Sequence, residues 1–489
     1  MNPPAPASGA PAQAGATCER PSLQRELGFW AAMAIVVGTT IGSAIFLVPT
    51  NMIQKVGSPG VVFMVWVFGG VLSLFGALTY AEMAAALPEA GGEYVYLRAA
   101  YGPFWGFVYG WTQMWVAKSA SIATLATGFF YYLANFWPDL SRVAFVIPGR
   151  LGPDGGPLEI RYGQLLGMGL ILGLGWLNYY GVRIGGGVQI AVTIIKVVLL
   201  LGIVIAGLGS GSGSTANYYA SIPAPGGVSG FFSALVAALW AYDGWNNVSM
   251  VASEVRKPGR NLPASLIGGM IIIIAIYLLA NAAYFLVLTP ADVARSERVA
   301  AEMMRRVLGG AGAAAVSLAA MISIFAALNG SILSGSRVPY AMARDGLFFQ
   351  PVAFVHRRFR TPAISILALS GWSAVILLSG RYEQLYTLVI FASWILYGMT
   401  TAAVFVLRRR HPELSRPYKV LGYPVVPVAF VVVAALLLAS TFLQSPRESI
   451  LGLTLIIAGI PFYFYWKRRN MARAQAPGAT PPTAVGPLP

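Results

Sequence analysis

The stretch Gly38-Thr-Thr-Ile-Gly-Ser-Ala44 interrupts an apolar segment that is otherwise long enough to cross a lipid bilayer. Further along the chain, Trp240-Ala-Tyr-Asp-Gly-Trp-Asn-Asn247 interrupts a second one. A backbone loosened at membrane depth is tolerated only where protein or a wet cavity satisfies its N–H and C=O groups. Paired interruptions in the two halves of a chain point to the binding site of a secondary transporter. The two stretches therefore predict a membrane carrier.

The composition of the chain excludes a soluble fold. Of its 489 residues, 57% are hydrophobic and only 10% are charged, and a soluble domain of this size could not bury so much apolar surface. We predict an all-α membrane protein with twelve transmembrane helices, at residues 28–53, 60–87, 104–135, 161–180, 184–208, 230–252, 264–288, 311–336, 361–379, 384–407, 425–443 and 448–466.

The formal net charge of +16 gathers in loops and tails. Dense basic clusters lie on one side of the predicted topology: Arg256-Lys257-Arg260, Arg357-Arg358-Arg360, Arg408-Arg409-Arg410 and Lys467-Arg468-Arg469. By the positive-inside rule, this side and both termini are cytoplasmic. The charge therefore indicates topology and contact with lipid headgroups rather than nucleic-acid binding. We expect a multi-pass protein of the cell (inner) membrane.

Two tails flank the membrane region. Residues 1–26 are rich in Pro, Ala and Gly and lack a hydrophobic signal segment, so we predict a disordered cytoplasmic tail there, and another at 467–489. Between them we place a ten-helix transport core at 27–407 and helices 11 and 12 at 408–466, to which we assign no mechanistic role. No cofactor or metal is expected, because the chain has one cysteine, Cys18, and two histidines outside the spans.

The first ten spans divide into two sets of five, and an interrupted helix opens each set. Span one follows a cytoplasmic terminus and span six follows an external loop, so the halves have opposite orientation, as an inverted repeat requires. The first interruption has a second interpretation, because Gly38 and Gly42 also form a GxxxG pattern, which lets membrane helices pack closely. The added polarity of Thr39, Thr40 and Ser43 favours a site.

The interruptions offer groups that suit a zwitterion. Unwinding frees backbone N–H groups near Ser43 and Ala44, at the positive end of a helix dipole, where a carboxylate binds favourably. Freed carbonyl groups near Thr40, Trp240 and Asp243 can accept from an ammonium group. An α-amino acid fits both ends at once.

Four further side chains lie at membrane depth. Lys196 lies about 18 Å into its span at 1.5 Å per residue, so it faces the protein interior, either paired with a carboxylate or as a fixed cation that bridges span five to span one. Asp243 either caps the resumed helix or attracts a cationic substrate side chain. Trp240 is expected to act as an occluding gate. Lys118 is similarly deep, and we assign it no role.

Several ordered motifs resemble the L-type amino acid transporter branch of the amino acid–polyamine–organocation superfamily. They are Gly38-Thr-Thr-Ile-Gly-Ser-Ala-Ile-Phe46, Tyr80-Ala-Glu82, Pro88-Glu-Ala-Gly-Gly-Glu-Tyr94, Trp240-Ala-Tyr-Asp-Gly-Trp-Asn246, Glu254 with Asn261-Leu-Pro263, Asn329-Gly-Ser331 with Ser336-Arg337, and Leu407 to Val420. The resemblance covers nearly all of residues 28–420. It implies a LeuT-type fold, a 5+5 inverted repeat whose helices 1 and 6 are broken.

The resemblance also implies sodium-independent amino acid transport, commonly as an exchanger (antiporter), for neutral or cationic substrates. Lys196 matches a fifth-helix lysine that stands near a sodium site of sodium-coupled relatives, and we assign it to coupling. The predicted substrate site consists of Thr39, Thr40, Ile41, Gly42, Ser43, Ala44, Trp240, Ala241, Asp243, Gly244 and Asn246. Spans one and six are expected to rock against a scaffold of spans three, four, eight and nine.

The chain departs from the family pattern at two places. Ala44 replaces the usual glycine, and its methyl group is expected to narrow the site or shift the carboxylate contact. No cysteine lies between spans three and four, so no disulfide-linked heavy chain is expected. A proton-coupled symporter or uniporter stays as the alternative function, and a channel is a remote one. An enzyme is not expected, because no nucleophile–base pair or metal cluster lies within the predicted spans.

Overall fold

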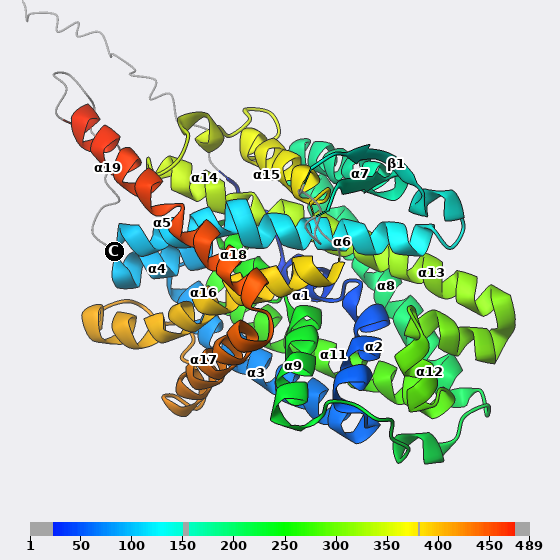
Figure 1. Cartoon of the computed structure of the whole chain (residues 1–489). Coiled ribbons are helices and arrows are strands. Elements are labelled where there is room, and N and C mark those ends of the chain that lie inside the picture. Colours follow the sequence, from blue (N-terminus) through cyan, green and yellow to red (C-terminus); the bar gives the residue numbers. More distant parts are fainter. Residues whose placement is uncertain (1–22, 150–155, 380–381, 475–489) are drawn as a thin grey trace, which may run out of the picture.

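The structure, a computed structural model, describes residues 23–149, 156–379 and 382–474. This part of the chain is a bundle of helices with one β-hairpin (Figure 1). Within it, eight helical runs are long and apolar enough to cross a membrane, and two shorter apolar helices, Gly227–Tyr242 and Ala363–Ile376, accompany them. The prediction of an all-α membrane protein is confirmed.

Each predicted span coincides with one helix or with a pair of helices. The first half contains α1 Phe29–Thr40, α2 Ala44–Val56, α3 Pro59–Ala86, α5 Pro103–Thr112, α6 Lys118–Leu133, α7 Tyr162–Tyr179 and α8 Val182–Gly209. The second half contains α9 Gly227–Tyr242, α10 Asn247–Met250, α11 Pro258–Val287, α13 Val299–Gly335, α15 Ala363–Ile376 and α16 Tyr382–Arg410. The remaining helices are α4 Glu93–Tyr101, α12 Pro290–Arg295, α14 Arg337–Arg344, α17 Val425–Gln444, α18 Pro446–Ile457 and α19 Ile460–Ala474.

The first span is broken between α1 and α2. Helix α1 ends at Thr40 because Ile41 has an extended backbone (φ −73°, ψ 95°), and α2 begins at Ala44. Threonine and glycine are weak helix formers. The Thr39 hydroxyl, which has one proton to donate, lies within hydrogen-bond distance of the carbonyl of Ile35 at 2.7 Å and of that of Gly244 at 2.8 Å. The second of these contacts ties the first break directly to the second.

The second break lies between α9 and α10. Asp243 is extended (φ −66°, ψ 145°), and Gly244 has φ +107°, a conformation that side chains other than hydrogen rarely adopt. A Cβ atom at Gly244 would lie 3.0 Å from the carbonyl oxygen of Thr39. A glycine is therefore required here both by the turn and by the approach of α1.

The two broken spans run antiparallel to each other. At one end, the N–H of Leu27 donates to the carbonyl of Glu254 at 2.9 Å, so the start of α1 lies beside the end of the second span. At the other end, the N–H of Gly226 donates to the carbonyl of Lys55 at 3.0 Å, so the end of α2 lies beside the start of α9. This is the opposite orientation that the inverted repeat predicts.

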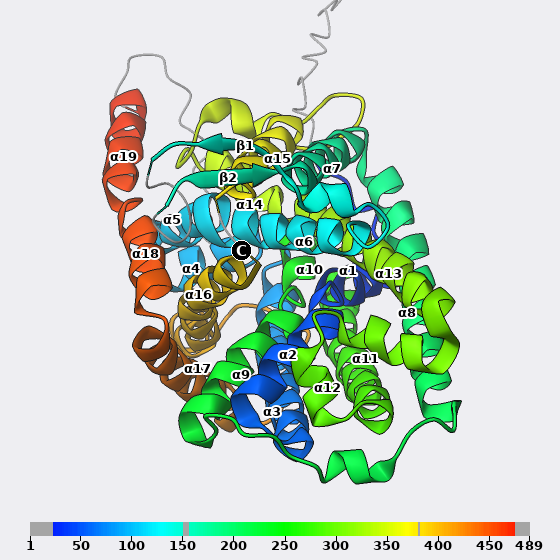
Figure 2. The ribbon, with the colours of Figure 1, turned by 45° about the vertical axis from the view of Figure 1, so that its right-hand side comes forward.

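Four other helices form a contiguous scaffold. Helices α6, α7, α13 and α15, which correspond to predicted spans three, four, eight and nine, contact one another in all pairings. A π-helical turn, Gln113–Ala117, joins α5 to α6 and ends directly before Lys118. Such turns are frequent at functional sites. Helices α17, α18 and α19 follow one edge of the bundle (Figure 2).

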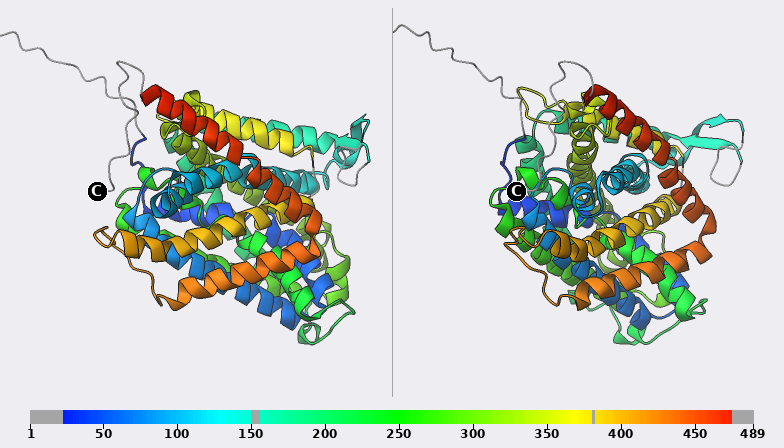
Figure 3. Two further views of the ribbon diagram at one scale, coloured as in Figure 1. Left: turned by 60° about the vertical axis from the view of Figure 1, so that its left-hand side comes forward. Right: turned by 90° about the vertical axis from the view of Figure 1, so that its left-hand side faces the viewer.

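Two features were not predicted. Strands β1 Val143–Ile147 and β2 Leu158–Arg161 pair antiparallel and project from the helical body between α6 and α7 (Figure 3). Helix α19 continues to Ala474, so residues 467–474 are helical rather than part of a disordered tail. This extension packs on the body, because the Asn470 amide donates to the carbonyl of Gly346 at 3.0 Å. The predicted tails at 1–22 and 475–489 lie outside the described residues.

Candidate functional site

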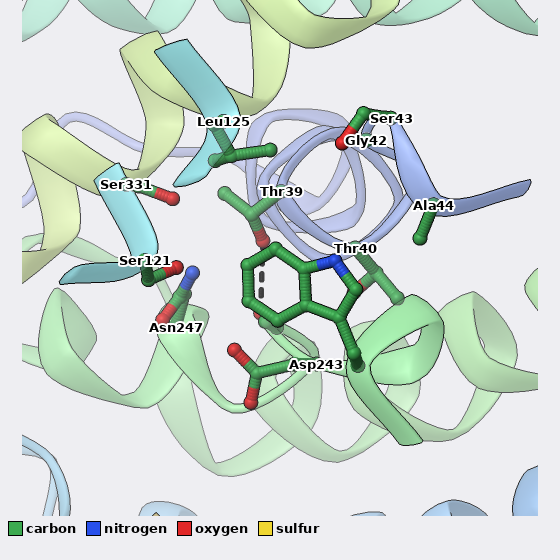
Figure 4. Close-up of a pocket in the computed structure, with 12 residues that line it drawn as sticks. Thr39, Thr40, Gly42, Ser43, Ala44, Ser121, Leu125, Asp243, Asn247 and Ser331 are labelled. Carbon is green, nitrogen blue, oxygen red and sulfur yellow. Dashed lines mark hydrogen bonds between the residues drawn. The ribbon is translucent and has the colours of Figure 1, made fainter. Parts of the chain in front are cut away.

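A cavity lies where the two breaks meet (Figure 4). Residues from α1, α2, α6, the second break and α13 line it: Thr39, Thr40, Gly42, Ser43, Ala44, Ser121, Leu125, Trp240, Asp243, Gly244, Asn247 and Ser331. The volume of the cavity is about 10 Å³, which is about the volume that one water molecule needs. The cavity is therefore small, and a ligand must displace its walls.

Most of the predicted substrate-site residues line this cavity, and three do not. Ile41 turns its carbonyl toward Lys196. The Ala241 carbonyl accepts from the Tyr277 hydroxyl at 2.8 Å. The Asn246 amide donates to Glu93 and so points away from the cavity. These three residues are adjacent to the breaks in the sequence, but they do not line the cavity.

The structure adds four lining residues that the sequence did not single out for the site: Ser121, Leu125, Asn247 and Ser331. Ser121, Asn247 and Ser331 gather on the side opposite Ser43 and Ala44 (Figure 4). Asn247 was within the quoted second interruption. Ser331 was within the quoted motif Asn329-Gly-Ser331. Ser121 lies inside the continuous helix α6, where a small polar residue has no sequence signal that distinguishes a cavity wall from a helix contact.

The start of α2 forms one end of the cavity. The N–H groups of its first turn, including those of Ala44 and Ile45, have no acceptor inside the helix, and they carry the positive end of the helix dipole. The Thr40 hydroxyl oxygen beside them is buried and has no hydrogen-bond partner among the described residues. This end of the cavity suits an anion such as a carboxylate. The Ala44 methyl group lines it, as expected from the departure at that position.

The Tyr277 hydroxyl links the two breaks. It lies 3.2 Å from the carbonyl oxygen of Thr40 and 2.8 Å from that of Ala241. A carbonyl oxygen has two lone pairs, so Thr40 retains the capacity to accept from an ammonium group as well. The carbonyl of Trp240 accepts from the N–H of Asp243 at 3.2 Å.

Lys196 on α8 holds the first break open. Its ammonium donates to the carbonyls of Gly38 at 2.6 Å and Ile41 at 2.5 Å. The Ser323 hydroxyl on α13 donates to the carbonyl of Ile41 at 3.1 Å. No carboxylate of the described residues lies within ion-pair distance of Lys196. The bridge between spans five and one is therefore present, and the pairing with a carboxylate is not.

The glycine pattern of the first break serves packing as well. A Cβ atom at Gly38 would lie 2.1 Å from the amide nitrogen of Gln189 on α8, and one at Gly42 would lie 2.9 Å from Leu125 on α6. Both glycines allow close approach of a neighbouring helix. Packing and site formation are thus properties of the same five-residue stretch.

Asp243 is held by a side chain from α16. Its carboxylate accepts from the Tyr397 hydroxyl at 2.8 Å. Helix α10 begins at Asn247, and its N-cap residue is Asn246, three positions after Asp243, so Asp243 does not occupy the N-cap position of α10. The Lys118 ammonium donates to the Asn247 amide oxygen at 2.6 Å and attracts both Asp243 and Glu93 electrostatically.

Trp240 lies between the central cavity and Tyr386 of α16. The side chain is 5% exposed, and its ring stacks on that of Tyr386 from α16, with centroids 6.1 Å apart and planes 16° apart. This position at the end of α9 is where the sequence predicted a gate.

Two broken antiparallel helices around one small cavity, inside an all-α multi-pass membrane protein, define a secondary transporter. Comparison with known proteins gives the family. The amino acid permease family matches residues 27–464, and the chain belongs to that family.

Among its relatives is the serine/threonine exchanger SteT of Bacillus subtilis, 32% identical over 451 residues, which cover 92% of this chain and 98% of the relative. The human b(0,+)-type amino acid transporter 1 is 32% identical over 459 residues, or 93% of this chain and 90% of the relative. The human Asc-type amino acid transporter 1 is 30% identical over 463 residues, or 92% and 84%. The resemblance that the motifs carry is confirmed over nearly the whole chain.

Proposed function

We propose that this chain is a sodium-independent amino acid exchanger that works by alternating access in the cell membrane. The observation that carries the proposal is the meeting of both helix breaks at one cavity, cross-linked by the Thr39 hydroxyl and the Gly244 carbonyl. The substrate carboxylate meets the start of α2, and its ammonium meets the carbonyl of Thr40. The relative named as a serine/threonine exchanger supports this assignment.

The proposed substrates are small neutral amino acids. The wall opposite the start of α2 carries the side chains of Ser121, Asn247 and Ser331, which suit a short polar side chain. Lys118 supplies a fixed cation beside Asp243, so a cationic substrate side chain would be repelled where the acid alone would attract it. Of the two roles left open for Asp243, selection of cationic substrates is therefore suppressed by Lys118.

Lys196 takes the place of a coupling ion in this proposal. Its ammonium, held by the carbonyls of Gly38 and Ile41, supplies a positive charge at the point where backbone oxygens converge. A resident cation makes binding of sodium there unfavourable. Both termini are proposed to be cytoplasmic, and transport is proposed to need no disulfide-linked partner, since Cys18 is the one cysteine.

Counterflow in proteoliposomes tests the exchange mechanism. Vesicles loaded with unlabelled serine are expected to take up labelled serine faster than empty vesicles, with no requirement for external sodium. Equal uptake by loaded and empty vesicles would contradict exchange and favour proton-coupled transport, and uptake that does not saturate would favour a channel. A competition panel of arginine, alanine, serine, leucine and an amine without a carboxylate defines the substrate class.

A further inference from the structure

A second cavity lies between the end of α2, the starts of α9 and α16, and the end of α17. We call it the Lys55 cavity. The volume of the Lys55 cavity is about 140 Å³, compared with about 10 Å³ for the central cavity, which lies where the two breaks meet. Its walls are Asn51, Lys55, Ser233, Val236, Tyr386, Thr387, Ser440, Thr441, Gln444 and Ser445. Val236 is the single aliphatic residue in this set, so the cavity is polar.

The described wall of the cavity carries one positive charge. Among the described residues that line it, Lys55 is the only charged one. Among the described residues, no ion pair or side-chain hydrogen bond engages the Lys55 ammonium. The backbone of Lys55 is fixed, because its carbonyl accepts from the N–H of Gly226. A positioned cation in a polar cavity is complementary to a small anion.

The opposite wall is ordered by hydrogen bonds that include the end of α17. The Ser233 hydroxyl donates to the amide oxygen of Gln444, and the amide nitrogen of Gln444 donates to the Ser440 hydroxyl oxygen at 2.6 Å. The Ser440 hydroxyl can still donate its own proton to a ligand. The predicted eleventh span, to which we assign no mechanistic role from its sequence, thus forms part of an ordered polar wall.

The two cavities share an aromatic wall. Trp240 lines the central cavity and Tyr386 lines the Lys55 cavity, and their rings stack against each other. With the N-terminus cytoplasmic, as predicted, the end of α2 faces the outside. A molecule that reaches the central cavity from the outside therefore passes the Lys55 cavity first.

We propose that the Lys55 cavity is a loading subsite, which binds the carboxylate of an incoming amino acid before the Trp240–Tyr386 pair opens. This inference rests on the proposed amino acid transport. The Lys55 ammonium holds the carboxylate, and the hydroxyl and amide groups of the opposite wall hold the ammonium group or bound water. Because the subsite lies on one side of the gate, its effect is confined to transport in one direction.

Cells that express the full chain test the proposal, because in them the outside of the carrier faces the medium. Lys55→Gln is expected to raise the external KM for serine at least about tenfold, as expected for a lost charge-assisted hydrogen bond, with the maximal rate unchanged. Lys55→Arg, which retains the charge, is expected to stay near the wild type. The matched control is Arg142→Gln on the β-hairpin, where the side chain is 75% exposed, and it is expected to leave the external KM unchanged.

Three outcomes would overturn the subsite. The first is an unchanged external KM in Lys55→Gln while wild-type counterflow is intact. The second is an equal rise in the KM for efflux from preloaded cells, which would show a general effect on folding or on the central site. The third is an effect of Lys55→Gln on the external KM that is present in vesicles of anionic phosphatidylglycerol and absent in vesicles of phosphatidylcholine. That result would identify the anion bound by Lys55 as a lipid headgroup. Failure of wild-type counterflow would instead refute the proposed function.

Discussion

The Arg337 guanidinium and the Glu254 carboxylate form a bidentate ion pair, with Nε–Oε1 at 2.8 Å and Nη2–Oε2 at 3.0 Å, and both side chains are 1% exposed. Glu254 ends the short helical turn after α10, and Arg337 begins α14. The pair therefore fastens the second broken span to the end of the scaffold helix α13. Glu254 thus anchors the structure, and it is not among the residues that line the central cavity.

Glu254→Gln is expected to destabilise the protein strongly. The substitution leaves the Arg337 charge buried without its partner, and such changes cost about 3–5 kcal/mol. The matched control is Glu302→Gln, which removes an ion pair with the exposed side chain of Arg305 and is expected to cost about 1 kcal/mol or less. Thermal unfolding of both variants in detergent measures the difference, and equal losses would refute the role assigned to the buried pair.

Lys196→Met is expected to reduce the exchange rate by at least about tenfold, because each hydrogen bond from a charged group contributes about 1.5–3 kcal/mol. Ser323→Ala removes a neutral donor to the Ile41 carbonyl and is expected to reduce the rate about fivefold or less. Initial rates of serine counterflow at equal amounts of reconstituted protein provide the comparison. A Lys196→Met rate within about twofold of the wild type would mean that the first break keeps its shape without the lysine.

Lys118→Gln is expected to change which amino acids compete. Without the ammonium, Asp243 retains the Tyr397 hydroxyl and can attract a cationic side chain, so arginine should inhibit serine uptake in this variant and not in the wild type. The double variant Lys118→Gln with Asp243→Asn should lose the inhibition again. If Asp243→Gly leaves cationic and neutral uptake unchanged, Asp243 plays no part in selectivity.

Gly244→Ala is expected to abolish exchange or to destabilise the protein by about 1–3 kcal/mol, because the alanine must adopt a positive φ. Its Cβ atom would also press on the Thr39 carbonyl, which belongs to the backbone and cannot rotate away. The matched control is Gly371→Ala in α15, where a Cβ atom meets no atom within 4 Å. Unfolding midpoints and counterflow rates that match between the two variants would contradict the requirement for glycine.

Much of the fold could be predicted from the sequence because a bilayer imposes strict requirements on each segment that crosses it. Twenty or so apolar residues are needed for each span, and polar interruptions stand out against them. The spans, the two breaks and the antiparallel halves could be predicted from these requirements. The β-hairpin and the helical residues 467–474 could not, because segments as short as these carry weak propensities that tertiary contacts override.

The sequence by itself determined that two interruptions of the membrane-spanning backbone form the centre of this protein, because residues such as Gly42 and Gly244 are local determinants of chain conformation. It could not determine which side chains line the wall. Ser121 and Ser331 reach the cavity only through the packing of α6 and α13, and Lys118 reaches Asn247 across 129 positions of sequence. Such contacts depend on how helices assemble, and no residue pattern within one helix encodes them.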